Sequence, residues 1–131
     1  MSKGKPKKLP TTTRELEAIR CALRRFLPDD LVWYIEGGKV WAPIPRQTCR
    51  LEVAVEPTTT AAGRPAVCYA ISCAQWTARG RNLSDAAAVF VSMLEGGVER
   101  LRERRAEGHV LRSEDRITLA VALAAGALER A

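Results

Sequence analysis

The sequence predicts an α+β fold with an N-terminal helix, an antiparallel sheet of four to five strands, and two C-terminal helices packed on one sheet face. Two observations lead to this prediction. Apolar residues recur at helical spacing near both ends of the chain, whereas they alternate with period two between residues 31 and 80. Strands in one run with helices outside it favour a single sheet covered on one side. At 131 residues, the chain is expected to form one domain over residues 11–131.

The first ten residues form a basic segment that precedes this domain. Lys3, Lys5, Lys7 and Lys8 are interleaved with glycine and proline, and no apolar run follows them. Such a composition cannot bury a core, so residues 1–10 are predicted to be a disordered basic arm. The same segment lacks the apolar stretch of a secretory signal, and a cytoplasmic location is therefore expected.

The segment TTTRELEAIRCALRRFLP predicts the first helix. Thr12 and Glu15 have the spacing of a capping box, and Pro28 ends the helix. One apolar stripe runs along it, and several arginines lie mostly off that stripe, which suits either a solvated face or a surface for phosphates. The stripe consists of Leu16, Ile19, Leu23 and Phe26, and the arginines include Arg20, Arg24 and Arg25.

The next segment, LVWYIEGGKVWAPIP, predicts a β-hairpin and holds three of the seven aromatic residues of the chain. Gly37-Gly38 can supply the positive backbone angles that a two-residue turn needs. Centring the turn there fixes which residues face each other across the two strands. The resulting pairs are Glu36 with Lys39, Ile35 with Val40, and Tyr34 with Trp41.

Strand alternation sorts the aromatic residues of this hairpin onto two faces. Trp33 falls on an apolar core face, whereas Tyr34 and Trp41 fall on the other face as a cross-strand pair, flanked by an expected Glu36–Lys39 ion pair. If no helix covers that second face, these four residues form an exposed surface suited to binding a protein. The alternative is that the later helices cover the pair and make it part of the core.

Three further strands are expected to complete the sheet. RLEVAVEP and AVCYAISC alternate with period two, and WTARG adds a short fifth strand. The segment TTTAAGRP between the first two has turn residues and no periodicity, so it is expected to be a loop.

Two helices are predicted after the strands. Asn82 can cap the first of them with Asp85 in its first turn, and Gly96-Gly97 is expected to kink or end it. Ser113 can cap the last helix, residues 113–130, whose apolar side is mostly alanine. Alanine allows close approach but buries little area, so this helix is expected to pack tightly on a neighbour, either within the chain or across a homodimer.

The inventory of reactive side chains does not indicate an enzyme. There is no nucleophile elbow and no phosphate-binding glycine loop, and the lone His109 falls in a polar connector. The four cysteines contain no Cys-x-x-Cys pair, so free thiols are expected, and neither a metal site nor a cofactor is predicted. The cysteines are Cys21, Cys49, Cys68 and Cys73.

Residues 51–105 resemble HicB-type antitoxins and small proteins of phages and mobile elements. The resemblance lies in two strands, a short third strand and a helix that opens with a Gly-x-polar-Leu-x-x-Ala pattern. The family's Pro-Gly-Cys turn and its DNA-binding tail have no counterpart here. The resemblance implies a non-enzymatic module that binds a macromolecule stoichiometrically, as an inhibitor or antitoxin does. The matching positions are Gly80, Asn82, Leu83 and Ala86.

Two functions are therefore open. The first is a protein-binding module that uses Tyr34, Trp41, Lys39 and Glu36, with a homodimer formed through residues 113–130. The second is a nucleic-acid binder, which the net charge of +6 suits because basic side chains bind phosphates by releasing counterions. Its candidate residues are Lys3, Lys5, Lys7, Lys8, Arg20, Arg24 and Arg25.

Overall fold

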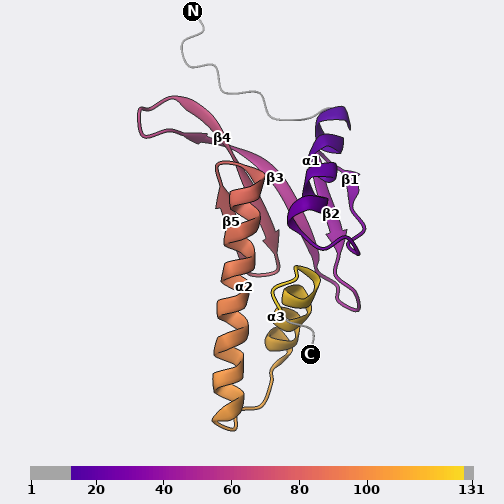
Figure 1. The fold of residues 1–131 in the computed structure, drawn as a ribbon, viewed down its shortest axis with the longest axis vertical. Helices are drawn as coiled ribbons and strands as arrows, with labels where there is room; N and C mark the ends of the chain where they lie inside the picture. Colours follow the sequence, from indigo (N-terminus) through magenta and orange to yellow (C-terminus); the bar gives the residue numbers. More distant parts are fainter. Residues whose placement is uncertain (1–12, 129–131) are drawn as a thin grey trace, which may run out of the picture.

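Period-two alternation in the middle of the chain produces a five-stranded antiparallel sheet whose strands lie side by side in sequence order. The computed structural model describes residues 13–128 (Figure 1), so the predicted basic arm lies outside the described residues. The strands are β1 (Tyr34–Glu36), β2 (Lys39–Pro43), β3 (Arg50–Thr59), β4 (Pro65–Cys73) and β5 (Trp76–Gly80).

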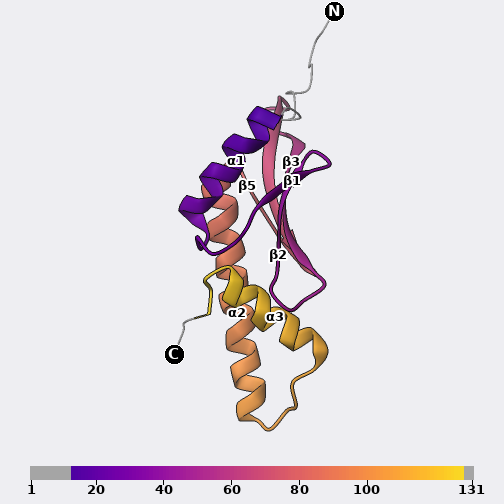
Figure 2. The same cartoon turned by 90° about the vertical axis from the view of Figure 1, so that its right-hand side faces the viewer.

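Helical periodicity at the two ends produces three helices, α1 (Thr13–Phe26), α2 (Leu83–Ala106) and α3 (Ser113–Ala124). α1 packs on β1 and β2, and α2 packs on β4 and β5. Both lie on the same side of the sheet (Figure 2), and α3 packs on α2. The predicted α+β fold is therefore confirmed. Among residues 13–128, no helix combines the length and the apolar character needed to cross a membrane.

The β1–β2 hairpin has the predicted register. Gly37 and Gly38 both adopt positive φ, at 60° and 73°, which is the turn geometry that brings two strands together with only two residues. Tyr34 consequently faces Trp41, and Glu36 faces Lys39.

The core lies between the sheet and the helices. Trp33 is only 4% exposed, and the fully buried Phe90 of α2 belongs to the same apolar cluster. Alternation continues across the neighbouring strands, because their inward positions are buried while the intervening ones are partly exposed. The buried strand residues include Val40, Ala42, Leu51, Val53, Ile71, Cys73 and Ala78.

Of the two expectations for Gly96-Gly97, the end of the helix is wrong, because α2 continues unbroken to Ala106. The reason is tertiary packing. A Cβ built on Gly97 would lie 2.8 Å from Cη2 of the Trp76 ring, so the indole packs on the bare helix backbone there. A Cβ on Gly96 would meet nothing closer than Arg100 Nη1, at 3.7 Å. Packing against β5 therefore outweighs the weak helix propensity of glycine.

Two details of the other helices also differ from expectation. Phe26 is 39% exposed, because Leu27 beside it is buried in its place. Arg112, and not Ser113, occupies the N-cap position of α3, and the Asp115 carboxylate of the first turn accepts from the Arg112 backbone N–H, with Oδ2 at 2.9 Å. The helix ends at Ala124 and packs on α2 of its own chain, so a homodimer through it stays a prediction.

The two adjacent glycines of α2 should respond oppositely to alanine. We expect Gly96→Ala to stabilise the fold by about 0.5–1 kcal/mol, because alanine favours the helix and the new methyl group has room. We expect Gly97→Ala to destabilise it by about 1–3 kcal/mol, because the methyl group would overlap the Trp76 ring. Urea unfolding of both variants measures the difference. Equal effects would show that Trp76 does not pack on Gly97.

Candidate binding surface on the open sheet face

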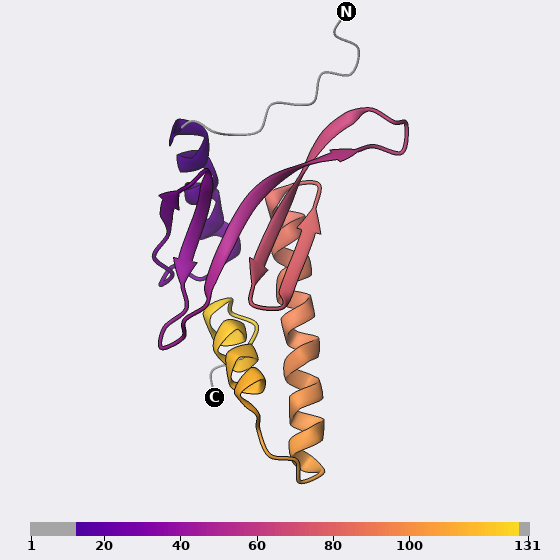
Figure 3. The ribbon, with the colours of Figure 1, turned by 180° about the vertical axis from the view of Figure 1, so that it is seen from behind.

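In the part of the chain that the structure describes, the face of the sheet opposite the helices is left open. Figure 3 shows it from behind, with α1 and α2 on the far side and no described helix in front of the strands. The strand registers align one row of side chains across this face, because each member faces the next across neighbouring strands. The row is Tyr34, Trp41, Glu52, Ser72 and Thr77.

Trp41 is contacted by side chains from both neighbouring strands. The Tyr34 ring stacks on it, with centroids 4.9 Å apart and planes inclined by 28°. The Arg50 guanidinium carbon lies 4.5 Å from the centroid of the Trp41 ring, which is a cation–π arrangement. Tyr34 keeps 47% of its surface exposed and Trp41 is half-buried. The later helices do not cover the pair, so the alternative that made it core is wrong.

Glu52 forms ion pairs with the two cations beside this aromatic pair, Arg50 and Lys39. Its Oε1 lies 3.0 Å from Arg50 Nη2, and its Oε2 lies 3.8 Å from Lys39 Nζ. The expected Glu36–Lys39 ion pair is therefore wrong, because Lys39 pairs with Glu52 on β3. A half-buried carboxylate gains more from a cation than the exposed Glu36 does. We call Tyr34, Trp41, Lys39, Arg50 and Glu52 the Trp41 patch.

Arg50 and Glu52 are the two members of this patch that the predicted binding residues lacked, whereas the predicted Glu36 lies beside the patch. Glu52 and Arg50 are two positions apart on one strand, so alternation places both on the open face. The signal was therefore present in the sequence. What the sequence could not supply was the pairing of β2 with β3, which sets Pro43 opposite Arg50 and Trp41 opposite Glu52.

The residues predicted to bind nucleic acid lie elsewhere. Arg20 forms an ion pair with Glu17, one turn earlier in α1. Arg24 and Arg25 are exposed, and Arg25 lines a groove of about 470 Å³ between α1 and α2. α1 packs on the face of the sheet opposite the Trp41 patch, so these arginines do not lie near the patch. The predicted lysines Lys3, Lys5, Lys7 and Lys8 lie outside the described residues.

Side chains with catalytic potential are scattered. His109 lies in the connector after α2, with its Nε2 3.5 Å from Glu107 Oε2, and it is exposed. Burial raises the pKa of the Cys73 thiol to about 12, and the neighbouring Cys49 adds to the shift. Within residues 13–128, no group of histidine, cysteine and carboxylate side chains could hold a metal ion.

Comparison with known proteins yields no matching family model, no matching curated protein and no matching solved structure. What the Trp41 patch can do is therefore argued from its own geometry.

The buried Cys73 thiol should make stability depend on alkaline pH. Its folded-state pKa of about 12 lies above the ordinary value of 9.0. The protonated thiol therefore makes its full contribution to the free energy of unfolding below pH 9.0, and this contribution is lost as the pH rises toward 12. When the pH is raised from about 8 to about 11, the free energy of unfolding should fall by about 2–3 kcal/mol more in the wild type than in Cys73→Ala. Urea unfolding at both pH values tests this. A difference that stays constant with pH would contradict the shift.

Proposed function

We propose that the chain is a protein-binding module whose contact surface is the Trp41 patch. The observation that supports this most strongly is the Tyr34–Trp41–Arg50 stack on a sheet face that no described helix covers. Tryptophan, tyrosine and arginine are the side chains that most often dominate binding energy in protein interfaces. Here their backbone positions are held by paired strands, so little ordering should be needed on binding.

The charges around the stack favour a protein partner over a polyphosphate. Lys39 and Arg50 are matched by Glu52 within the patch and by Glu36 beside it. A surface that binds phosphates needs an excess of cations, because its affinity comes from counterion release. A balanced polar rim around an aromatic centre is instead typical of a protein interface.

We further propose that this binding is stoichiometric and involves no catalytic step. The resemblance of residues 51–105 to HicB-type antitoxins supports a role as an inhibitor or antitoxin-like protein, which acts by occupying the surface of its partner. A homodimer through residues 113–130 belongs to the same proposal. Leu123 of α3 supports it, because 44% of this apolar side chain is exposed.

Nucleic-acid binding is the second candidate. It is supported by the net charge of +6 and by Arg24 and Arg25, which are exposed on α1 and form no ion pair with another described residue. This function would use the helix-covered side of the molecule and the predicted basic arm. It would leave the Trp41 patch without a part in binding, unless unpaired bases stack on its rings.

Alanine substitution in the patch should remove the partner. We expect Tyr34→Ala and Trp41→Ala each to weaken capture from extracts of the source organism about 30-fold or more, because each removes a central aromatic contact. Phe26→Ala is the matched control, since Phe26 is an exposed aromatic on α1, and it should bind like the wild type. Circular dichroism of each variant establishes that it folds. Loss of binding in Phe26→Ala but not in the patch variants would overturn the proposal.

Salt and nuclease separate the two candidate functions. For a protein partner, we expect capture to survive nuclease and to change less than about threefold when salt rises from about 50 to 200 mM. Binding through several phosphates would instead fall by orders of magnitude over that range. It would also weaken in the double variant Arg24→Glu, Arg25→Glu. That second pattern would establish nucleic-acid binding and contradict the proposed function.

A further inference from the structure

Beside β5, at the end of the sheet farthest from β1, part of β4 has an edge that no described strand pairs with. β5 ends at Gly80, which faces Tyr69 of β4, whereas β4 extends four residues further out, from Pro65 to Cys68. These four residues pair with β3 on one side and have no described strand on the other. Figure 1 shows the β3–β4 hairpin reaching past the start of α2 at this point. An unpaired strand edge offers backbone donors and acceptors to another extended chain.

A groove of about 920 Å³ follows this edge. Its walls are the outer part of β4, the threonines at the end of β3, and the junction between β5 and α2. Two of the lining residues are the arginines Arg79 and Arg81, and none carries a carboxylate. Arg79 donates to Glu56 at 3.0 Å, while the exposed Arg81 forms no ion pair with another described residue. The groove therefore has an unbalanced positive charge.

We propose that this groove binds an extended segment of a partner protein that carries acidic side chains. The segment would pair with residues 65–68 of β4 and would continue the path of β5 beyond Gly80. Backbone groups of β4 would hold the main chain, and Arg81 would bind a carboxylate of the segment. Strand addition to a sheet edge is a general mode of peptide recognition, in which main-chain hydrogen bonds supply affinity and side chains supply specificity.

Charge argues against a second copy of the chain as the occupant. Two copies paired edge to edge would bring the arginines of both grooves together, and like charges facing each other in an interface are unfavourable. The other unpaired edge of this hairpin, on β3, suits an added strand less well. Pro57 lies in the middle of it and has no backbone N–H to donate.

The groove and the Trp41 patch are independent surfaces. The patch lies on β1, β2 and the start of β3, whereas the groove lies along the outer part of β4, the end of β3 and the end of β5, toward the opposite edge of the sheet. The same partner could occupy both, but neither proposal requires the other. Tests of the two can therefore fail separately.

A titration of the ¹⁵N-labelled full chain followed by nuclear magnetic resonance tests the proposal. The probe is a pool of acetylated, amidated octapeptides in which Val, Ile or Thr alternates with Asp or Glu. We expect backbone amide shifts concentrated at residues 66–69 and 80–82, with saturation at about 0.1–1 mM peptide. A pool with lysine at the acidic positions should shift these amides at least about tenfold less, because Arg81 repels the positive charge of lysine.

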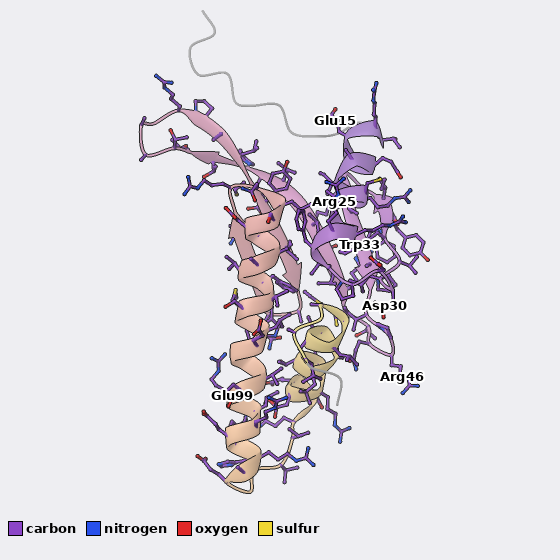
Figure 4. All side chains as sticks on the ribbon, viewed as in Figure 1. Glu15, Arg25, Asp30, Trp33, Arg46 and Glu99 are labelled. Carbon is purple, nitrogen blue, oxygen red and sulfur yellow. The ribbon has the colours of Figure 1, made fainter. Side chains whose placement is uncertain are left out.

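Substitutions then test the role of charge. Arg81→Glu should weaken binding of the acidic pool about tenfold, because it replaces the free cation by a repelling anion. Arg46→Glu is the matched control: this exposed arginine lies in the loop between β2 and β3, away from the groove (Figure 4), and its variant should bind like the wild type.

Four results would overturn the proposal. The first is the absence of shifts at residues 66–69 with saturating acidic pool, and the second is a response that Arg81→Glu leaves unchanged. The third is a stronger response of the same amides to a single-stranded oligothymidylate, which would assign the groove to nucleic acid. Shifts of these amides on concentrating the chain without peptide would equally overturn it, because they would identify a second copy as the occupant.

Discussion

Within residues 13–128, helices cover the sheet on only one face, and the rest of the structure depends on this constraint. Strand alternation gives each face half of the side chains, and both α1 and α2 pack on the same half. Trp33 therefore enters the core, while Trp41, facing the other way, stays at the surface with Tyr34 and Arg50. A helix on the second face would have turned the same aromatic pair into core.

The long helix α2 maintains this arrangement through two close approaches to β5. A Cβ on Gly80 would lie 2.4 Å from the backbone nitrogen of Ala86, so the helix begins directly against the end of the strand. Farther along, Trp76 packs on Gly97, and Arg104 lies 3.3 Å from the buried carboxylate of Asp115 in α3. The close approach at Gly80 lies where β5 ends and α2 begins. The part of β4 beyond that point therefore pairs with β3 on one side and has no described strand on the other, which creates the groove beside Arg81.

Much of the fold could be predicted because its signals are local. Gly37-Gly38 and the alternation around it determine the hairpin register, and hence the faces on which Trp33 and Trp41 lie. The continuity of α2 could not be predicted, because it depends on Trp76, which is distant in sequence from the glycines that it contacts. The pairing of Lys39 with Glu52, and the place of Arg50 over Trp41, likewise depend on how β3 aligns with β2 across a loop.

The central claim is that Trp41, and not Trp33, meets the partner. It is tested most directly by fluorine nuclear magnetic resonance of the chain labelled with 5-fluorotryptophan, in which all three indoles are kept and each signal is assigned from a single Trp→Phe variant. Adding the captured, unlabelled partner should shift the Trp41 signal, with saturation at one equivalent, and should leave the Trp33 signal unchanged. A complex that forms while the Trp41 signal stays constant would contradict the account.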